Sequence, residues 1–256
     1  MSDIVLHVKA NVLPRLFANP NRIGEFGPAC SDAAMSGFTS LSDKSPVTAL
    51  AVVIRQIVAK LADADPIKIS KPTRWVDRLT GQAAENYVRY HVAVRDLDTL
   101  LLEAEQHADA VRALVDELDE MMGRYEIEQQ ELEAYIRAGQ EFLAENPGAG
   151  VPSNADLEFD NPRERFERVL TNLTTLKASH GMTAMQLKLL KAQALSMLDR
   201  FIETSRTLVP LWRQHSASLT AAKHMDSAGI AAASQAHSAL VSSLSDTVKQ
   251  VSTTTH

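Results

Sequence analysis

The side chains that most often do chemistry are sparse in this chain of 256 residues. Cys30 is the single cysteine, which excludes an intramolecular disulfide and a cysteine-based zinc or iron–sulfur centre. Nothing in the adjacent sequence activates its thiol as a nucleophile. His180 and His215 fall on an apolar helical stripe, where we expect satisfied core or edge histidines and not ligands. These residues predict no catalytic group.

Two pairs of residues with metal-binding side chains could hold a metal ion on a helix. Glu103 and His107 are four residues apart, as are Glu105 and Asp109, and helical bundles bind metals through such pairs. The same residue types are common on a solvated acidic face, and no second Glu-x-x-His follows later in the chain. No Gly-rich phosphate loop, G-x-S-x-G, H-E-x-x-H or C-x-x-C occurs either. We therefore expect no metal, no cofactor and no enzymatic activity.

The most unusual local sequence places a proline beside a tryptophan and an arginine. It consists of Pro210, Leu211, Trp212, Arg213 and Gln214. Pro210 removes one backbone hydrogen bond and predicts a kink in its helix. Two interpretations stay open: Trp212 packs on the shorter helices at a bend, or the segment is a docking site, since Trp and Arg are favoured interface anchors.

Two long apolar tracks supply the elements that position these residues. Their apolar residues recur at alternating steps of three and four, the 3.5-residue period of a coiled-coil stripe. The tracks predict an all-α fold: a long antiparallel, coiled-coil-like hairpin with short helices packed at one end. Its arms cover about 73–145 and 162–224, joined by a Pro/Gly-rich loop at 146–161 in which Asn161 or Asp160 can cap the return arm.

Shorter segments flank the arms. Pro and Gly without a sustained period predict an irregular or disordered segment over residues 1–45. Residues 46–256 are predicted to form the elongated bundle, with a helix at 47–62 and a C-terminal helix at 226–250 beside one end of the arms. These helices are too short to cover both arms. We therefore expect the loop-side half to stay a thin hairpin or to pair with another copy as a homodimer.

Charge is distributed unevenly between the arms. Residues 96–145 carry fifteen Asp/Glu against three Lys/Arg, a balance of −12, whereas residues 163–224 carry ten Lys/Arg against four Asp/Glu, a balance of +6. Opposite charges favour pairing of the arms with each other; two solvated faces that merely differ are the alternative. The basic charges are too dispersed to predict a nucleic-acid site. No signal peptide or transmembrane segment is evident, so we expect a cytoplasmic protein, with peripheral membrane association left open.

Three stretches resemble the TelA family of toxic-anion, or tellurite, resistance proteins. Leu132-Glu133-Ala134-Tyr135-Ile136-Arg137-Ala138-Gly139-Gln140 is similar to the family's L-E-x-Y-I-x-A-G segment. Phe166-Glu167-Arg168-Val169 with Leu176-Lys177-Ala178-Ser179 is similar to the start of its return arm, and residues 210–214 are similar to P-L-W-K-x-Q. His180 stands where the family usually has arginine, which marks a divergent member.

The resemblance implies a non-enzymatic helical protein that contributes to tolerance of tellurite, other toxic anions or envelope stress. It also implies that Tyr135, Gly139 and residues 210–214 are the positions to examine as a partner-binding site. We expect the protein to act by association with an unidentified protein. A structural coiled-coil scaffold or oligomeric rod is the alternative, and an oxyanion reductase is disfavoured because it would need thiols or a redox cofactor.

Overall fold

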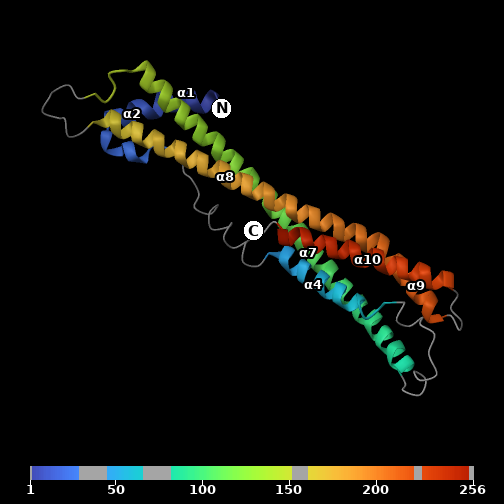
Figure 1. Cartoon of the computed structure of the whole chain (residues 1–256). Coiled ribbons are helices and arrows are strands. Elements are labelled where there is room, and N and C mark those ends of the chain that lie inside the picture. The colour runs from blue at the N-terminus through green and yellow to red at the C-terminus, as the bar shows by residue number, and fades with distance from the viewer. Residues whose placement is uncertain (1, 29–44, 66–81, 152–160, 222–226, 254–256) are drawn as a thin grey trace. The chain divides into compact units, whose positions relative to one another are not determined.

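The computed structural model describes residues 2–28, 45–65, 82–151, 161–221 and 227–253. These residues form helices and turns with no strand among them, which confirms the predicted all-α class. Contacts divide the chain into two compact units, Met1–Thr39 with Glu117–Leu190 and Ser40–Asp116 with Lys191–His256. The two longest helices, α7 (Gln82–Glu145) and α8 (Pro162–Glu203), contribute residues to both units (Figure 1).

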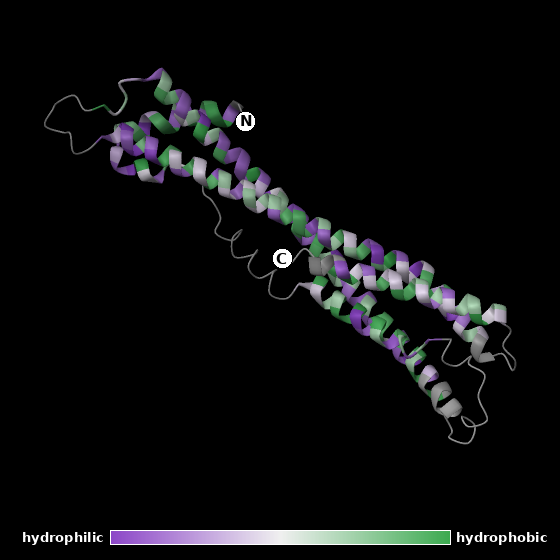
Figure 2. Ribbon diagram, in the orientation of Figure 1, coloured by the Kyte–Doolittle hydropathy of each residue, from purple (hydrophilic) through white to green (hydrophobic). Residues whose placement is uncertain are grey.

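In the first unit α7 and α8 run antiparallel, as the sequence predicts. Glu133 of α7 pairs with Lys177 of α8 at 3.2 Å, and the earlier residue Glu128 lies 3.5 Å from the later residue His180. Both helices are amphipathic in this region (Figure 2). Their facing apolar residues are buried, among them Leu132, Ile136, Leu143, Phe166, Leu170 and Leu173. The opposite charges of the arms therefore meet here in a direct ion pair between Glu133 and Lys177.

The turn between α7 and α8 is held by capping interactions. Asn161 accepts a hydrogen bond from the Glu164 amide at 3.3 Å, which confirms Asn161 as the N-cap ahead of Pro162. Across the turn, the Arg163 guanidinium donates to the carbonyls of Leu143 and Pro147 at 3.4 and 3.2 Å. A cation at a helix C-terminus satisfies carbonyls that have no partner within the helix. The first turn of α8 thus fixes the end of α7.

The N-terminal segment differs from the irregular chain expected for residues 1–45. It forms α1 (Ser2–His7), a π-helical turn η1 (Val8–Val12), α2 (Leu13–Ala18) and a 3₁₀ helix η2 (Pro20–Glu25). The Leu13 amide donates to the Val8 carbonyl, a π-type bond that aligns residues five apart. Val5, Val8, Leu13 and Leu16 are buried together. Their spacing does not follow an α-helical period, so the apolar pattern of the sequence does not indicate these helices.

These N-terminal helices cover α7 and α8 beside the turn. The first unit buries Val8, Leu13, Ile23 and Phe26 in one cluster with the apolar faces of both long helices. The predicted bare hairpin in this half is therefore wrong, because the chain supplies its own cover. The remainder of the segment expected to be irregular, residues 29–44, lies outside the described residues.

The second unit combines α4 (Pro46–Leu61), the first part of α7, the end of α8, a π turn η4 (Thr204–Leu208), α9 (Val209–Ala221) and α10 (Ser227–Thr253). Helix α10 packs against α9 and α4. Lys60 of α4 pairs with Asp96 of α7 at 2.8 Å. The two predicted short helices are thus present and packed beside the long ones. None of the described helices combines the length and apolar character needed to cross a membrane.

The hydrogen-bonding pattern of the helix changes near Pro210, the residue predicted to interrupt it. Pro210 cannot donate to the carbonyl of Arg206, and the π turn η4 ends two residues before it, at Leu208. Within this turn the Thr204 hydroxyl lies 2.6 Å from the Ser243 hydroxyl of α10. Thr204 is buried, so this bond joins the π turn to α10.

Candidate binding sites

A pocket of about 490 Å³ opens in the first unit between the N-terminal helices and α7. Its polar lining consists of Asn11, Arg15, Asn19, Arg22 and Glu25. Its apolar lining consists of Val12, Leu16, Phe26 and Tyr135. The Phe26 ring lies 5.4 Å from the Tyr135 ring. Tyr135, one of the residues singled out from the sequence, therefore belongs to a pocket whose other walls come from the segment that was expected to be irregular.

The charges of this pocket are unbalanced. Glu25 accepts hydrogen bonds from Arg22 through Nε and Nη2, both at 2.9 Å, so these two side chains neutralise each other. Arg15 makes no ion pair within the part of the chain that the structure describes. The lining therefore carries one net positive charge, supplied by Arg15.

Gly139 lies where α7 packs closely against side chains of α8. A Cβ atom at this position would stand 2.5 Å from Leu170 Cδ2 and 3.1 Å from Phe166 Cζ. Both side chains are buried in the core of the first unit. The glycine of the Leu132–Gln140 stretch therefore serves close helix packing, one turn away from the pocket residue Tyr135.

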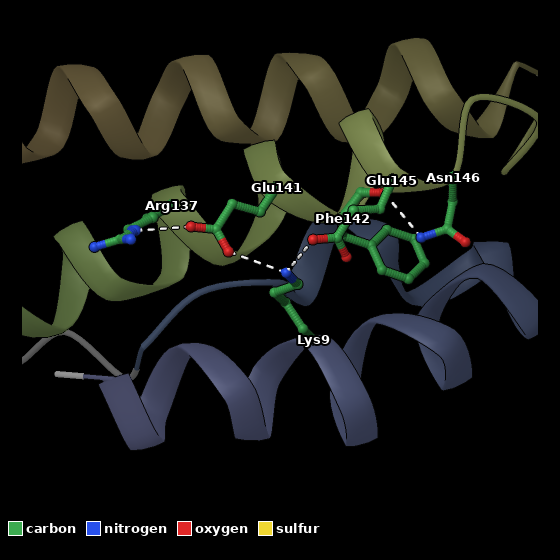
Figure 3. A network of polar contacts seen from close by, with 6 residues as sticks. All are labelled: Lys9, Arg137, Glu141, Phe142, Glu145 and Asn146. Atoms are coloured by element: carbon green, nitrogen blue, oxygen red, sulfur yellow. Dashed lines mark hydrogen bonds and ion pairs between the residues drawn. The ribbon is translucent and has the colours of Figure 1, made fainter.

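A polar network attaches the N-terminal helices to the same stretch of α7 (Figure 3). Lys9 donates to Glu141 at 3.0 Å and to Glu145 at 2.5 Å, and Arg137 donates to Glu141 at 2.8 Å. The hydrogen bonds to Glu145 and Glu141 raise the pKa of Lys9. Those from Arg137 and Lys9 lower the pKa of the Glu141 carboxyl. Both groups are thus held in their charged forms.

Further along the two long helices, three polar side chains meet inside the first unit. The Tyr125 and His180 rings contact edge to face, with centroids 5.3 Å apart, and His180 Nδ1 lies 3.5 Å from Glu128 Oε2. Burial, and then the Glu128 charge, raise the pKa of Tyr125. His180 is 9% exposed, which fits the expectation of a core or edge histidine.

The segment 210–214 lies in the second unit with its tryptophan pointing inward. Trp212 is 1% exposed, whereas Leu211 is 40% exposed. Arg213 donates to Asp98 of α7 through Nε at 2.9 Å and Nη2 at 2.6 Å. Pro210 and Gln214 are exposed. Trp212 is therefore part of the interior. Only the exposed residues of this segment are positioned to contact another protein.

The second unit buries several polar side-chain atoms, one of which belongs to Trp212. Tyr90 Oη, Trp212 Nε1 and Ser216 Oγ are buried without a hydrogen-bond partner among the described residues. Burial raises the pKa of Tyr90, and the nearby Ser216 hydroxyl opposes part of that rise. Trp212 and Ser216 are four residues apart on α9 and share one face.

The residues considered for metal binding do not form a larger ligand set. His107 Nε2 lies 3.9 Å from Glu103 Oε1, and Asp109 pairs with Arg112. No group of three or more His, Cys, Asp or Glu suited to a metal ion occurs among the described residues. Cys30 lies outside them. The absence of a metal and of a cofactor stays a prediction.

One face of α8 in the first unit is apolar and exposed. Met182, Met185 and Leu189 are 68%, 72% and 58% exposed, and Ala178 is also exposed. Their steps of four, three and four residues place them in one row with a heptad period. We call these four residues the α8 stripe. The predicted apolar track passes through Leu187 and not through these four residues, and the structure places them apart from the buried row that contains His180 and Leu187.

Comparisons with known proteins match the amino-acid sequence of this chain to one family. The family model described as "Toxic anion resistance protein (TelA)" matches residues 16–256. The chain is 49% identical over 245 residues to Protein KlaA of Escherichia coli, covering 95% of each chain. No solved structure matches. The match includes Tyr135, Gly139 and residues 210–214, so the positions that carried the resemblance lie inside the shared region. This chain belongs to the TelA family of toxic anion resistance proteins.

Proposed function

We propose that this protein contributes to resistance to tellurite, other toxic anions and cell-envelope stress in the cytoplasm by binding another protein, without catalysing a reaction. The α8 stripe is the observation that supports association. Large exposed side chains in a contiguous apolar row mark interaction surfaces more often than isolated ones do. Methionine is flexible and polarisable, and therefore adapts to the surface of a partner.

The proposed occupant of the stripe is an acidic amphipathic helix of the partner. Heptad spacing matches the knobs-into-holes packing of a second helix. From residue 168 to residue 190, α8 contains Arg168, Lys177 and Lys188 but no Asp or Glu. Lys177 is already paired with Glu133 of α7, which leaves the charges of Arg168 and Lys188 for a partner. Lys188 is exposed beside Leu189. Carboxylates flanking the apolar row of the incoming helix would complement this charge.

Complementation of a gene deletion tests the proposal. The triple variant Met182→Gln, Met185→Gln, Leu189→Gln should fail to restore tolerance to tellurite and envelope-active agents, although it accumulates and keeps its helicity. Leu102→Gln is the matched control, because Leu102 is 59% exposed on α7 and lies outside the stripe. This control should restore tolerance. Full tolerance with the triple variant would refute association through the stripe.

A separate variant tests the absence of catalysis. Reduction of tellurite consumes electrons, which a protein delivers through thiols or a redox cofactor. Cys30 is the only thiol in the chain. We expect Cys30→Ser to restore tolerance as well as the wild type does. Complete loss of tolerance in a well-folded Cys30→Ser protein would contradict a non-catalytic role.

Light scattering separates a partner-binding protein from the alternative of a structural rod. Self-association through the α8 stripe would give a mass that increases with protein concentration and decreases in the triple variant. A constant monomer mass in both proteins would support the proposal. Concentration-dependent assembly abolished by the triple variant would instead favour the rod.

A further inference from the structure

We propose that the pocket formed by the N-terminal helices and Tyr135 is a binding site for a small oxyanion. The inference rests on the chemistry of this pocket and not on the proposed role of the α8 stripe. Its volume of about 490 Å³ lies within the range of small-molecule sites. Nothing in the described pocket neutralises the one net positive charge of its lining.

Arg15 is the principal anion-binding group. A guanidinium carries five N–H donors, accepts no hydrogen bond, and matches the geometry of two oxygens on one anion. Asn11 and Asn19 precede and follow Arg15 by four residues, and all three line the pocket. The Asn11 amide is 3.3 Å from His7 Nδ1 and keeps a second N–H. The two asparagine side chains line the same pocket as Arg15 and supply neutral N–H donors for the same anion.

Arg22 also lines the pocket, and its guanidinium could donate to an anion if it were released from Glu25. It is already bonded to Glu25, whose carboxylate also lines the pocket and would repel an incoming anion. Both side chains of this pair are largely exposed, at 67% and 64%. Exposed ion pairs contribute little net stability and exchange readily. Removing the Glu25 charge should therefore free Arg22 for the anion and strengthen binding.

The apolar side of the pocket increases the strength of these contacts. Val12, Leu16 and the Phe26 and Tyr135 rings form this wall. Charge-assisted hydrogen bonds are stronger where part of the surrounding water is replaced by apolar groups. Leu16 and Phe26 belong to the buried core, so the wall is a fixed part of the unit.

Isothermal titration calorimetry on the full chain tests the site. The probes are sodium sulfate, sodium phosphate and sodium tellurite, each at an ionic strength held constant with sodium chloride. The proteins are wild type, Arg15→Gln, Glu25→Gln and Arg124→Gln. Arg124 is the matched control because it is an exposed arginine of the same unit that does not line the pocket. Circular dichroism establishes that every variant keeps its helicity.

We expect saturable one-to-one binding of at least one oxyanion to the wild type. Arg15→Gln should weaken it by roughly tenfold or more, the effect of losing a charge-assisted hydrogen bond. Glu25→Gln should tighten it, and Arg124→Gln should leave it unchanged. A merely structural role for these exposed residues would not give opposite effects for Arg15 and Glu25. Absence of saturable binding to the wild type, or equal binding by wild type and Arg15→Gln, would overturn the proposal.

Discussion

Substitution of the two glycines of α7 in the first unit measures how tightly α7 packs on α8. Replacing glycine by alanine inside a helix gains about 1 kcal/mol, because alanine has less backbone freedom to lose on folding. Gly123 and Gly139 both lie within α7. At Gly123 a Cβ would meet no atom within 4 Å. We therefore expect Gly123→Ala to stabilise the protein by about the full 1 kcal/mol.

Gly139→Ala should have the opposite sign. Its Cβ would stand 2.5 and 3.2 Å from the two Cδ atoms of Leu170 and 3.1 Å from Phe166 Cζ. Leu170 is 6% exposed and Phe166 is completely buried, so the added methyl group would press on side chains that are already packed. Overpacking of a core costs about 1–3 kcal/mol, which offsets or exceeds the helical gain. The net change should fall between roughly zero and 2 kcal/mol of destabilisation.

Urea unfolding followed by circular dichroism gives both numbers on the same scale. The two variants should differ by about 1–3 kcal/mol in the unfolding transition of the first unit. The chain has two units, and a single two-state fit does not describe the unfolding of both. The measured quantity is therefore the shift of the transition midpoint of each variant relative to the wild type. Equal stabilisation by both substitutions would refute close packing of α7 against α8 at Gly139.

Three further predictions follow from burial and charge. In thermal unfolding, Trp212→Ala should destabilise the second unit by about 3–5 kcal/mol, whereas Leu211→Ala should change stability by less than about 1 kcal/mol. Equal effects of the two substitutions would contradict the inward position of Trp212. The folded-state pKa of Glu141 is lowered and that of Lys9 is raised, so their stabilisation should be lost as the pH falls below about 4.5 and as it rises above about 10.5. In a profile of melting temperature against pH, Lys9→Met should flatten the alkaline end and only reduce the slope at the acid end, because Arg137 still holds the pKa of Glu141 down. Burial raises the pKa of Tyr90, so its phenol should ionise in the folded protein only above pH 10. An ultraviolet titration of Tyr90→Phe should therefore lack one of the tyrosines that ionise late in the wild type. An unchanged late phase would contradict the assignment of that tyrosine to Tyr90.

The positions on the long helices could be found from the sequence because they depend on local rules. The heptad rows of the two tracks predict α7 and α8, and the Pro/Gly-rich loop between them predicts that the chain reverses direction. Opposite net charges favour their pairing, in which Glu133 and Lys177 form an ion pair. Asn161 and Pro162 mark the start of α8 through capping chemistry. Gly139 and Tyr135 were found through a resemblance, since glycine and tyrosine alone do not reveal which helix they contact.

The pocket could not be found in the same way. Its walls come from residues 11–27 and from Tyr135, more than one hundred positions later in the chain. The N-terminal helices depend on a π turn and a 3₁₀ turn, in which buried residues do not recur at 3.6 positions. Short helices of this kind are stable only when packed on another element, here the faces of α7 and α8.

The amino-acid sequence by itself determined the class of fold, the two long helices, their direction relative to each other and the family. These follow from periodicity, caps, net charge and motif residues, which act over a few turns of chain. Only the tertiary structure decided that Trp212 points inward, that Met182, Met185 and Leu189 point outward, and that Arg15 lines a pocket with Tyr135. Apolar residues of one helix can lie on either of its faces. Which face is buried depends on which other segments cover it, and distant parts of the chain supply that cover.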